Sequence, residues 1–97
     1  MIKGFGLKDF FISWDSDKNE KLQNERNVSF EEIAFIIKND NVIDIIDNPS
    51  SNFDNQKCFI IEFENYIWVV PYVENGNDIF LKTAFPSRKH TKTYLNN

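Results

Sequence analysis

The feature that most constrains the fold is a change of hydrophobic period at Asn39-Asp40-Asn41. Before it, apolar residues follow the i, i+3, i+4, i+7 spacing of a helix that faces a core, at Phe30, Ile33, Ala34 and Ile37. After it, from Val42, short apolar runs separated by turn residues are typical of strands. A chain of 97 residues builds one hydrophobic core. We therefore expect a single domain over residues 1–97.

Two helices are predicted before this change of period. Asp15–Asp17 offers side-chain oxygens that can cap a helix over about residues 17–26. Asn27 is a suitable terminator because asparagine tolerates the left-handed conformation. Ser29–Glu32 forms a capping box, which predicts a second helix that ends near Lys38.

Strands are predicted over residues 8–14, 42–47, 57–63, 66–73 and 78–84. Glu64-Asn65 and Asn75-Gly76 stand at reversals, and such short connections force antiparallel neighbours. Pro86 should stop the last strand, and Ser87 can cap a final helix that runs through Leu95. The expected fold is α+β: a strand, two helices, an antiparallel four-strand meander and a short helix, with the helices on one face of the sheet.

The composition excludes several classes of protein. The chain has one cysteine, one histidine and three glycines, so neither a usual zinc site nor a glycine-rich phosphate loop is expected. We predict no metal and no cofactor. No apolar run reaches the roughly 20 residues of a membrane span, and the N-terminus lacks the apolar stretch of an export signal. A cytoplasmic protein without a membrane partner is expected.

Charge is divided unevenly along the chain. The net charge is −4, yet all fifteen acidic residues lie at or before Asp78. Beyond it, residues 80–94 contain no carboxylate, and their ionisable side chains include the basic residues Lys82, Arg88, Lys89, His90 and Lys92. This segment is either a solvated terminal helix or a surface that holds a phosphate chain, because attraction depends on the local potential.

A second basic stripe lies on the first predicted helix. Lys18, Leu22 and Arg26 are spaced at i, i+4 and i+8, with Lys21 one step around the helix and Glu25 interrupting the stripe. Alone it indicates only an exposed amphipathic face. If the fold brings it beside the C-terminal basic residues, the two surfaces would line a groove for RNA.

These residues resemble motifs of the BrnT family of toxins, which belong to the RelE-like superfamily. Trp14–Lys18 and Glu25–Glu32 match the family's N-terminal pattern at its spacing, without a gap. Lys82, Pro86–Arg88 and Thr91 stand where the family has a basic residue, a Ser-Ala-Arg-like triplet and a threonine. The family's Lys-His-Gly is replaced here by Glu25-Arg26-Asn27, so its histidine is missing.

The resemblance implies the toxin of a type II toxin–antitoxin system. Such a protein is an mRNA endoribonuclease, free or ribosome-associated, that inhibits translation. It also implies a cognate antitoxin, typically of the ribbon-helix-helix type, through which alone the complex would contact promoter DNA.

Metal-independent RNA cleavage uses the 2′-OH as nucleophile and needs a base, an acid and cations around the phosphorus. We expect Arg88 to stabilise the added charge because its planar fork can bind two phosphate oxygens. Lys82 and Arg26 are the expected phosphate ligands. The side chains expected to contact the RNA backbone are Lys18, Lys21, Lys89 and Lys92.

The general base is left open between two possibilities. His90 has a suitable intrinsic pKa, and a lysine whose pKa is lowered by neighbouring cations, Lys82 or Lys89, is the other. Tyr94 could stack on a base or supply a proton, or it could pack against the sheet. Because the base is not identified, a non-catalytic RNA- or protein-binding module with a basic C-terminal surface is the competing hypothesis.

Overall fold

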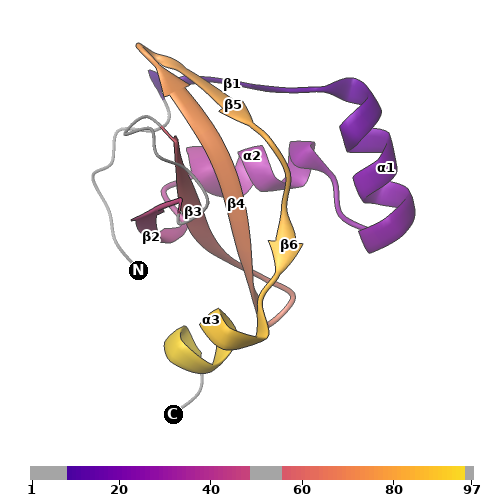
Figure 1. Ribbon diagram of the computed structural model, residues 1–97, viewed down its shortest axis with the longest axis vertical. Helices are drawn as coiled ribbons and strands as arrows, with labels where there is room; N and C mark the ends of the chain where they lie inside the picture. Colours follow the sequence, from indigo (N-terminus) through magenta and orange to yellow (C-terminus); the bar gives the residue numbers. More distant parts are fainter. Residues whose placement is uncertain (1–8, 49–55, 96–97) are drawn as a thin grey trace.

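The computed structural model describes residues 9–48 and 56–95 (Figure 1). Its elements follow in chain order: β1 (Phe11–Trp14), α1 (Ser16–Arg26), α2 (Phe30–Lys38), β2 (Val42–Asp47), β3 (Gln56–Phe63), β4 (Tyr66–Asn75), β5 (Asp78–Leu81), β6 (Phe85–Pro86) and α3 (Arg88–Tyr94). The strands of this part of the chain form one six-stranded sheet in the order β1-β5-β4-β3-β2, with β6 paired to β4. The predicted α+β class and the succession of the main elements are confirmed.

Local signals account for the two helices that precede the sheet. Asn27 ends α1 in the left-handed region, with φ 57°. Ser29 and Glu32 form the predicted capping box at the start of α2, where the Ser29 hydroxyl accepts from the Glu32 N–H. The predicted boundaries of both helices therefore agree with the structure to within one residue.

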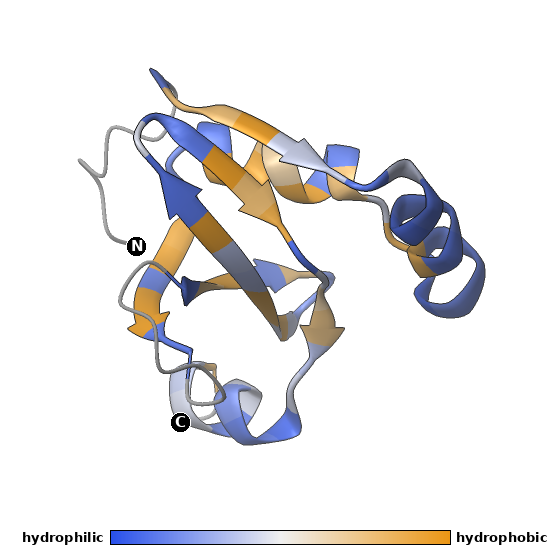
Figure 2. Ribbon diagram, turned by 45° about the horizontal axis from the view of Figure 1, so that its top comes forward, coloured by the Kyte–Doolittle hydropathy of each residue, from blue (hydrophilic) through white to orange (hydrophobic). Residues whose placement is uncertain are grey.

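A buried polar side chain holds these two helices together. Asn19 is 8% exposed, and its Nδ2 donates to Glu31 Oε1 at 2.8 Å while its Oδ1 accepts from the Phe30 N–H at 2.8 Å. The hydrogen bond from Asn19 is the main reason that the pKa of Glu31 is lowered. Because α1 is hydrophilic around most of its surface (Figure 2), this pair of hydrogen bonds supplements the sparse apolar contacts of the helix.

Strand β1 adds the parallel part of the sheet. Its residues pair in parallel with β5, for example Ile12 with Ile79. The neighbouring pairs β2–β3, β3–β4 and β4–β5 are all antiparallel. The predicted antiparallel meander is therefore present, and β1 makes the sheet mixed by adding a parallel edge. No hairpin joins β1 to its neighbour, since α1, α2 and three strands intervene, so the connection leaves the direction of β1 free.

The last predicted strand, residues 78–84, ends three residues early, at Leu81, opposite a proline on its neighbour. The Lys82 N–H donates to the Pro71 carbonyl at 2.9 Å, but Pro71 has no N–H with which to return the bond. Strand β5 ends at Leu81, and the chain rejoins β4 only at β6, where Phe85 pairs with Val69 and Pro86 with Trp68. Pro86 therefore lies within a short strand that the sequence did not predict.

The two faces of the sheet are covered differently. The inner face packs against α1 and α2 and supplies the larger core cluster, whose sheet residues include Phe59, Ile61, Trp68, Val70 and Tyr72. The outer face carries the smaller cluster of Cys58, Ile60, Ile67 and Val69, against which Tyr94 and Leu95 of the α3 end pack. The prediction that all helices share one face is wrong for α3, because β6 carries the chain along β4 and releases it on the outer side.

Candidate functional site

The outer face contains a cleft of about 650 Å³ beside α3. Sheet register explains its floor: Ile46 pairs with Cys58, and Cys58 pairs with Pro71, so the three side chains form one row across β2, β3 and β4. Val69 lies two residues before Pro71 and so faces the same side of the strand. These four residues give the cleft an apolar floor. Because they face away from α2, they do not pack into the larger core cluster.

Basic side chains from three segments surround this floor. They are Lys18 of α1, Lys82 after β5, and Lys89 and His90 of α3. Thr83 and Phe85 complete the side near β6, and Asp47 and Asn48 stand at the β2 side. Thus α1 and the C-terminal segment, far apart in the sequence, meet at one cleft.

The position of Lys18 follows from the proline in β4. Because Pro71 cannot donate to the Lys82 carbonyl, that oxygen accepts instead from Lys18 Nζ at 3.2 Å. This contact places the Lys18 ammonium beside the Lys82 backbone and at the cleft. Lys18 and Thr83 also line a smaller adjacent hollow of about 250 Å³, together with Lys21 and Arg26.

Arg26 anchors α1 to the same connection between β5 and β6. Its Nη1 donates to the Ala84 carbonyl at 2.9 Å, a partly buried bond, and Arg26 does not line the larger cleft within the described chain. Lys21 lies 4.0 Å from Glu25, one turn away, with both side chains largely exposed. The structure therefore separates these two predicted RNA contacts from the main cleft.

His90 is held by the residue that caps its helix. The Ser87 hydroxyl accepts from the His90 backbone N–H at 3.2 Å and lies 2.8 Å from His90 Nδ1. A hydroxyl can donate to a neutral Nδ1 or accept from a protonated one. Nε2 is therefore the ring nitrogen that remains available to a ligand. The His90 ring also stacks on the Tyr94 ring, with a distance of 6.3 Å between the ring centroids.

A hydrogen-bond chain fixes α3, and with it His90, to the sheet. The Ile67 N–H donates to Thr91 Oγ1 at 2.9 Å, and that hydroxyl donates to the Ser87 carbonyl at 2.7 Å. The Ser87 N–H donates in turn to the Ile67 carbonyl at 2.9 Å. Thr91 belongs to the motif that the sequence offered, but its positioning role required the structure.

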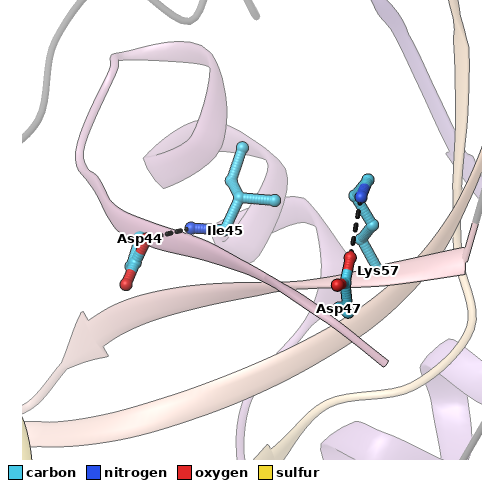
Figure 3. A network of polar contacts seen from close by, with 4 residues as sticks. All are labelled: Asp44, Ile45, Asp47 and Lys57. Atoms are coloured by element: carbon cyan, nitrogen blue, oxygen red, sulfur yellow. Dashed lines mark hydrogen bonds and ion pairs between the residues drawn. The ribbon is translucent and has the colours of Figure 1, made fainter. Parts of the chain in front are cut away.

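Tyr94 lies away from the cleft. Its hydroxyl donates to Asp44 Oδ2 at 2.8 Å, and this hydrogen bond is the main reason that the pKa of Tyr94 is raised. The other Asp44 oxygen accepts from the Ile45 N–H (Figure 3). Of the three roles considered for Tyr94, the contacts correspond to packing on the sheet, and not to stacking on RNA or supplying a proton.

The other basic residues of α3 and the cysteine complete the outer face. Arg88 and Lys92 are exposed and do not line the cleft in the described part of the chain. Cys58 is buried in the floor, and its burial raises the pKa of the thiol. The positive charges that converge on the cleft are thus those of Lys18, Lys82 and Lys89, and not that of Arg88.

Comparisons with known proteins add no relative to this picture. No protein-family model, curated protein or solved structure matches the chain. Among residues 9–48 and 56–95, no group of histidine, cysteine, aspartate and glutamate side chains is arranged to hold a metal ion. None of the helices described there is long and apolar enough to cross a membrane.

Proposed function

We propose that the protein is a metal-independent endoribonuclease, the toxin of a type II toxin–antitoxin pair, and that the outer-face cleft is its active site. One observation carries this proposal: Lys18, Lys82 and Lys89 meet the only histidine of the chain at one cleft of an acidic protein. Clustered cations favour a phosphate chain, and a histidine supplies proton transfer near neutral pH.

The geometry suggests a role for each group. In the tautomer in which Nδ1–H donates to the Ser87 hydroxyl, His90 Nε2 removes the proton of the 2′-OH, and Ser87 fixes the orientation of the ring. Lys82 and Lys89 stabilise the charge that develops on the phosphate oxygens as the 2′-oxygen attacks and the P–O5′ bond breaks, and a lysine ammonium or water gives a proton to the departing 5′-oxygen. Lys18 binds the flanking phosphate. Arg88, first expected to be the charge stabiliser, instead contacts RNA outside the cleft, as do Lys21 and Lys92.

The resemblance to BrnT-like toxins supports the biological side of the proposal. The substrate is mRNA in the cytoplasm, free or on the ribosome. A cognate antitoxin, of the ribbon-helix-helix type, silences the enzyme by placing an acidic segment across the lysines of the cleft, since opposite charge attracts such a segment. Promoter DNA is bound only through that antitoxin.

The decisive experiment uses the purified full chain in the presence of a chelator. Incubation with a single-stranded RNA should yield fragments that end in a 2′,3′-cyclic phosphate, the product of attack by the 2′-oxygen. We expect His90→Gln to slow cleavage by about 100-fold or more, in the range typical of a lost general base. Lys38→Ala, at the exposed end of α2, is the matched control and should cleave normally.

Induction in a bacterial host gives the second readout. The wild-type chain should arrest growth and fragment mRNA, and His90→Gln should relieve both effects. A wild-type chain that binds RNA but leaves it intact would identify a non-catalytic RNA-binding module. A chain that neither binds nor cleaves RNA and is harmless at high expression would overturn the proposal entirely.

A further inference from the structure

The cleft contains more apolar surface than phosphate binding requires. Ile46, Cys58, Val69 and Pro71 form its floor, and they belong to three adjacent strands. A phosphate group gains nothing from such a floor, because its oxygens need donors or cations. A ligand that also carries a flat apolar body would bury this surface as well as meeting the lysines.

An aromatic side chain stands at the edge of this floor. Phe85 remains 37% exposed, although it pairs across the sheet with Val69, which is 4% exposed. Proteins that bind single-stranded nucleic acids use such partly exposed aromatic rings as platforms on which bases stack. Phe85 and Val69 therefore offer a stacking surface directly beside the lysines.

Charge gives the cleft a direction. Lys82 follows β5 at one side, whereas Asp47 ends β2 at the other, and β4 and β3 lie between these two strands. Asp47 is paired with Lys57 at 2.9 Å (Figure 3) and keeps its side chain 90% exposed. The opposite charges of this pair offset each other, so the surplus positive charge of the cleft lies with Lys82 and the other lysines. A nucleotide would therefore place its phosphate at the lysines and its base toward β2.

We infer that the floor of the cleft is a subsite for one unstacked nucleobase of single-stranded RNA, with Phe85 as its stacking platform. This inference rests on the proposed function, because it assigns the RNA substrate to the same cleft. It adds that the protein recognises a base at the site of cleavage, and not only the sugar-phosphate chain.

Binding to uncleavable RNA tests the inference independently of catalysis. The probes are short 2′-O-methyl oligoribonucleotides with a fluorescent end label, either complete or carrying one abasic residue at each position in turn. Anisotropy titrations with the full chain should show one position at which loss of the base weakens binding roughly fivefold or more, the effect of one lost stacking contact. Loss of the base elsewhere should matter little.

Variants separate the base subsite from the phosphate sites. Phe85→Ala should abolish the preference for the complete probe at that position, and Phe85→Trp should restore it. Phe35→Ala, which removes a ring that is 70% exposed on α2, is the matched control and should change nothing. Lys82→Ala should weaken both probes equally, leaving their ratio unchanged.

The possible results are distinguishable. Equal binding of complete and abasic probes by the wild-type chain, or equal losses from Phe85→Ala and Phe35→Ala, would overturn the base subsite. A clear base preference in a protein that never cleaves unmodified RNA would keep the subsite and overturn the nuclease.

Discussion

The inner and outer faces of the sheet are built from the same two central strands but have different properties. On β3, Phe59 and Ile61 face the helices and Cys58 and Ile60 face outward, as the alternation of a strand requires. Among residues 9–48 and 56–95, the inner face packs against α2 and Leu22 of α1, whereas the outer face is covered only at its α3 end. One strand pair thus supplies both a packed core and the floor of a cleft.

The two faces also differ in the interactions that attach the helices to them. Apolar packing closes the inner face, with Phe59 stacked on Tyr72 at a centroid distance of 3.9 Å. Hydrogen bonds of Thr91 and Tyr94 attach α3 to the outer face, and no residue of α3 in the described chain is fully buried. Loss of an inner-face contact should therefore destabilise the whole domain, while loss of a contact between α3 and the outer face should mainly loosen α3.

The largest effect should come from Phe59→Ala. This side chain is fully buried, so its removal leaves a cavity and should lower the free energy of unfolding by about 3–5 kcal/mol. Cys58→Ala, one residue earlier and on the outer face, should cost only about 1 kcal/mol. Urea unfolding followed by tryptophan fluorescence measures both. Equal losses would remove the distinction between the two faces.

Thr91→Val should have an intermediate effect. The substitution keeps the shape of the side chain but leaves the Ile67 N–H without its acceptor, which should cost about 2 kcal/mol. We expect this loss of stability to appear as faster hydrogen exchange at the Ile67 amide and within α3, while the exchange of the inner-face amides stays unchanged. Thr91→Ser retains the hydroxyl and should stay close to wild type. Uniformly faster exchange would show that α3 is coupled to the whole core.

The smallest effect should be pH-dependent and come from Tyr94. Its pKa is raised because the hydroxyl donates to Asp44, so the neutral form is favoured in the folded chain. The hydrogen bond from Tyr94 to Asp44 contributes fully to the free energy of unfolding below the pKa of an unfolded tyrosine. This contribution is lost as the pH rises through the higher pKa of Tyr94 in the folded chain. Tyr94→Phe should cost about 1 kcal/mol at neutral pH.

The difference in unfolding free energy between wild type and Tyr94→Phe should shrink as the medium becomes alkaline. Measuring the difference removes the titration of Tyr72, whose pKa burial raises in both proteins. A difference that does not change with pH would show that the bond to Asp44 does not hold α3.

Much of the fold was predictable because its signals are local. Ser29 and Glu32 define the start of α2, and Asn27 the end of α1, within a few residues of sequence. The direction of β1 was not predictable, since its partner β5 lies far along the chain. Pro71 did carry a signal for the early end of β5, because a proline inside a central strand indicates a break in the ladder.

The candidate site was predictable by charge but not by shape. Clustering of basic residues beyond Asp78 pointed to Lys82, Lys89 and His90. It could not separate them from Arg88, because the direction of each side chain depends on where α3 rests. The apolar floor was invisible in the sequence, since only register places residues of separate strands in one row.

The pairing of β1 with β5 has a consequence for synthesis. Lys18 emerges from the ribosome before its partner carbonyl at Lys82 and before the α3 residues Lys89 and His90. Long-range pairings of this kind form only once both segments are present. A nascent chain therefore carries no assembled cleft until α3 has also been synthesised, however early β1 and α1 are made.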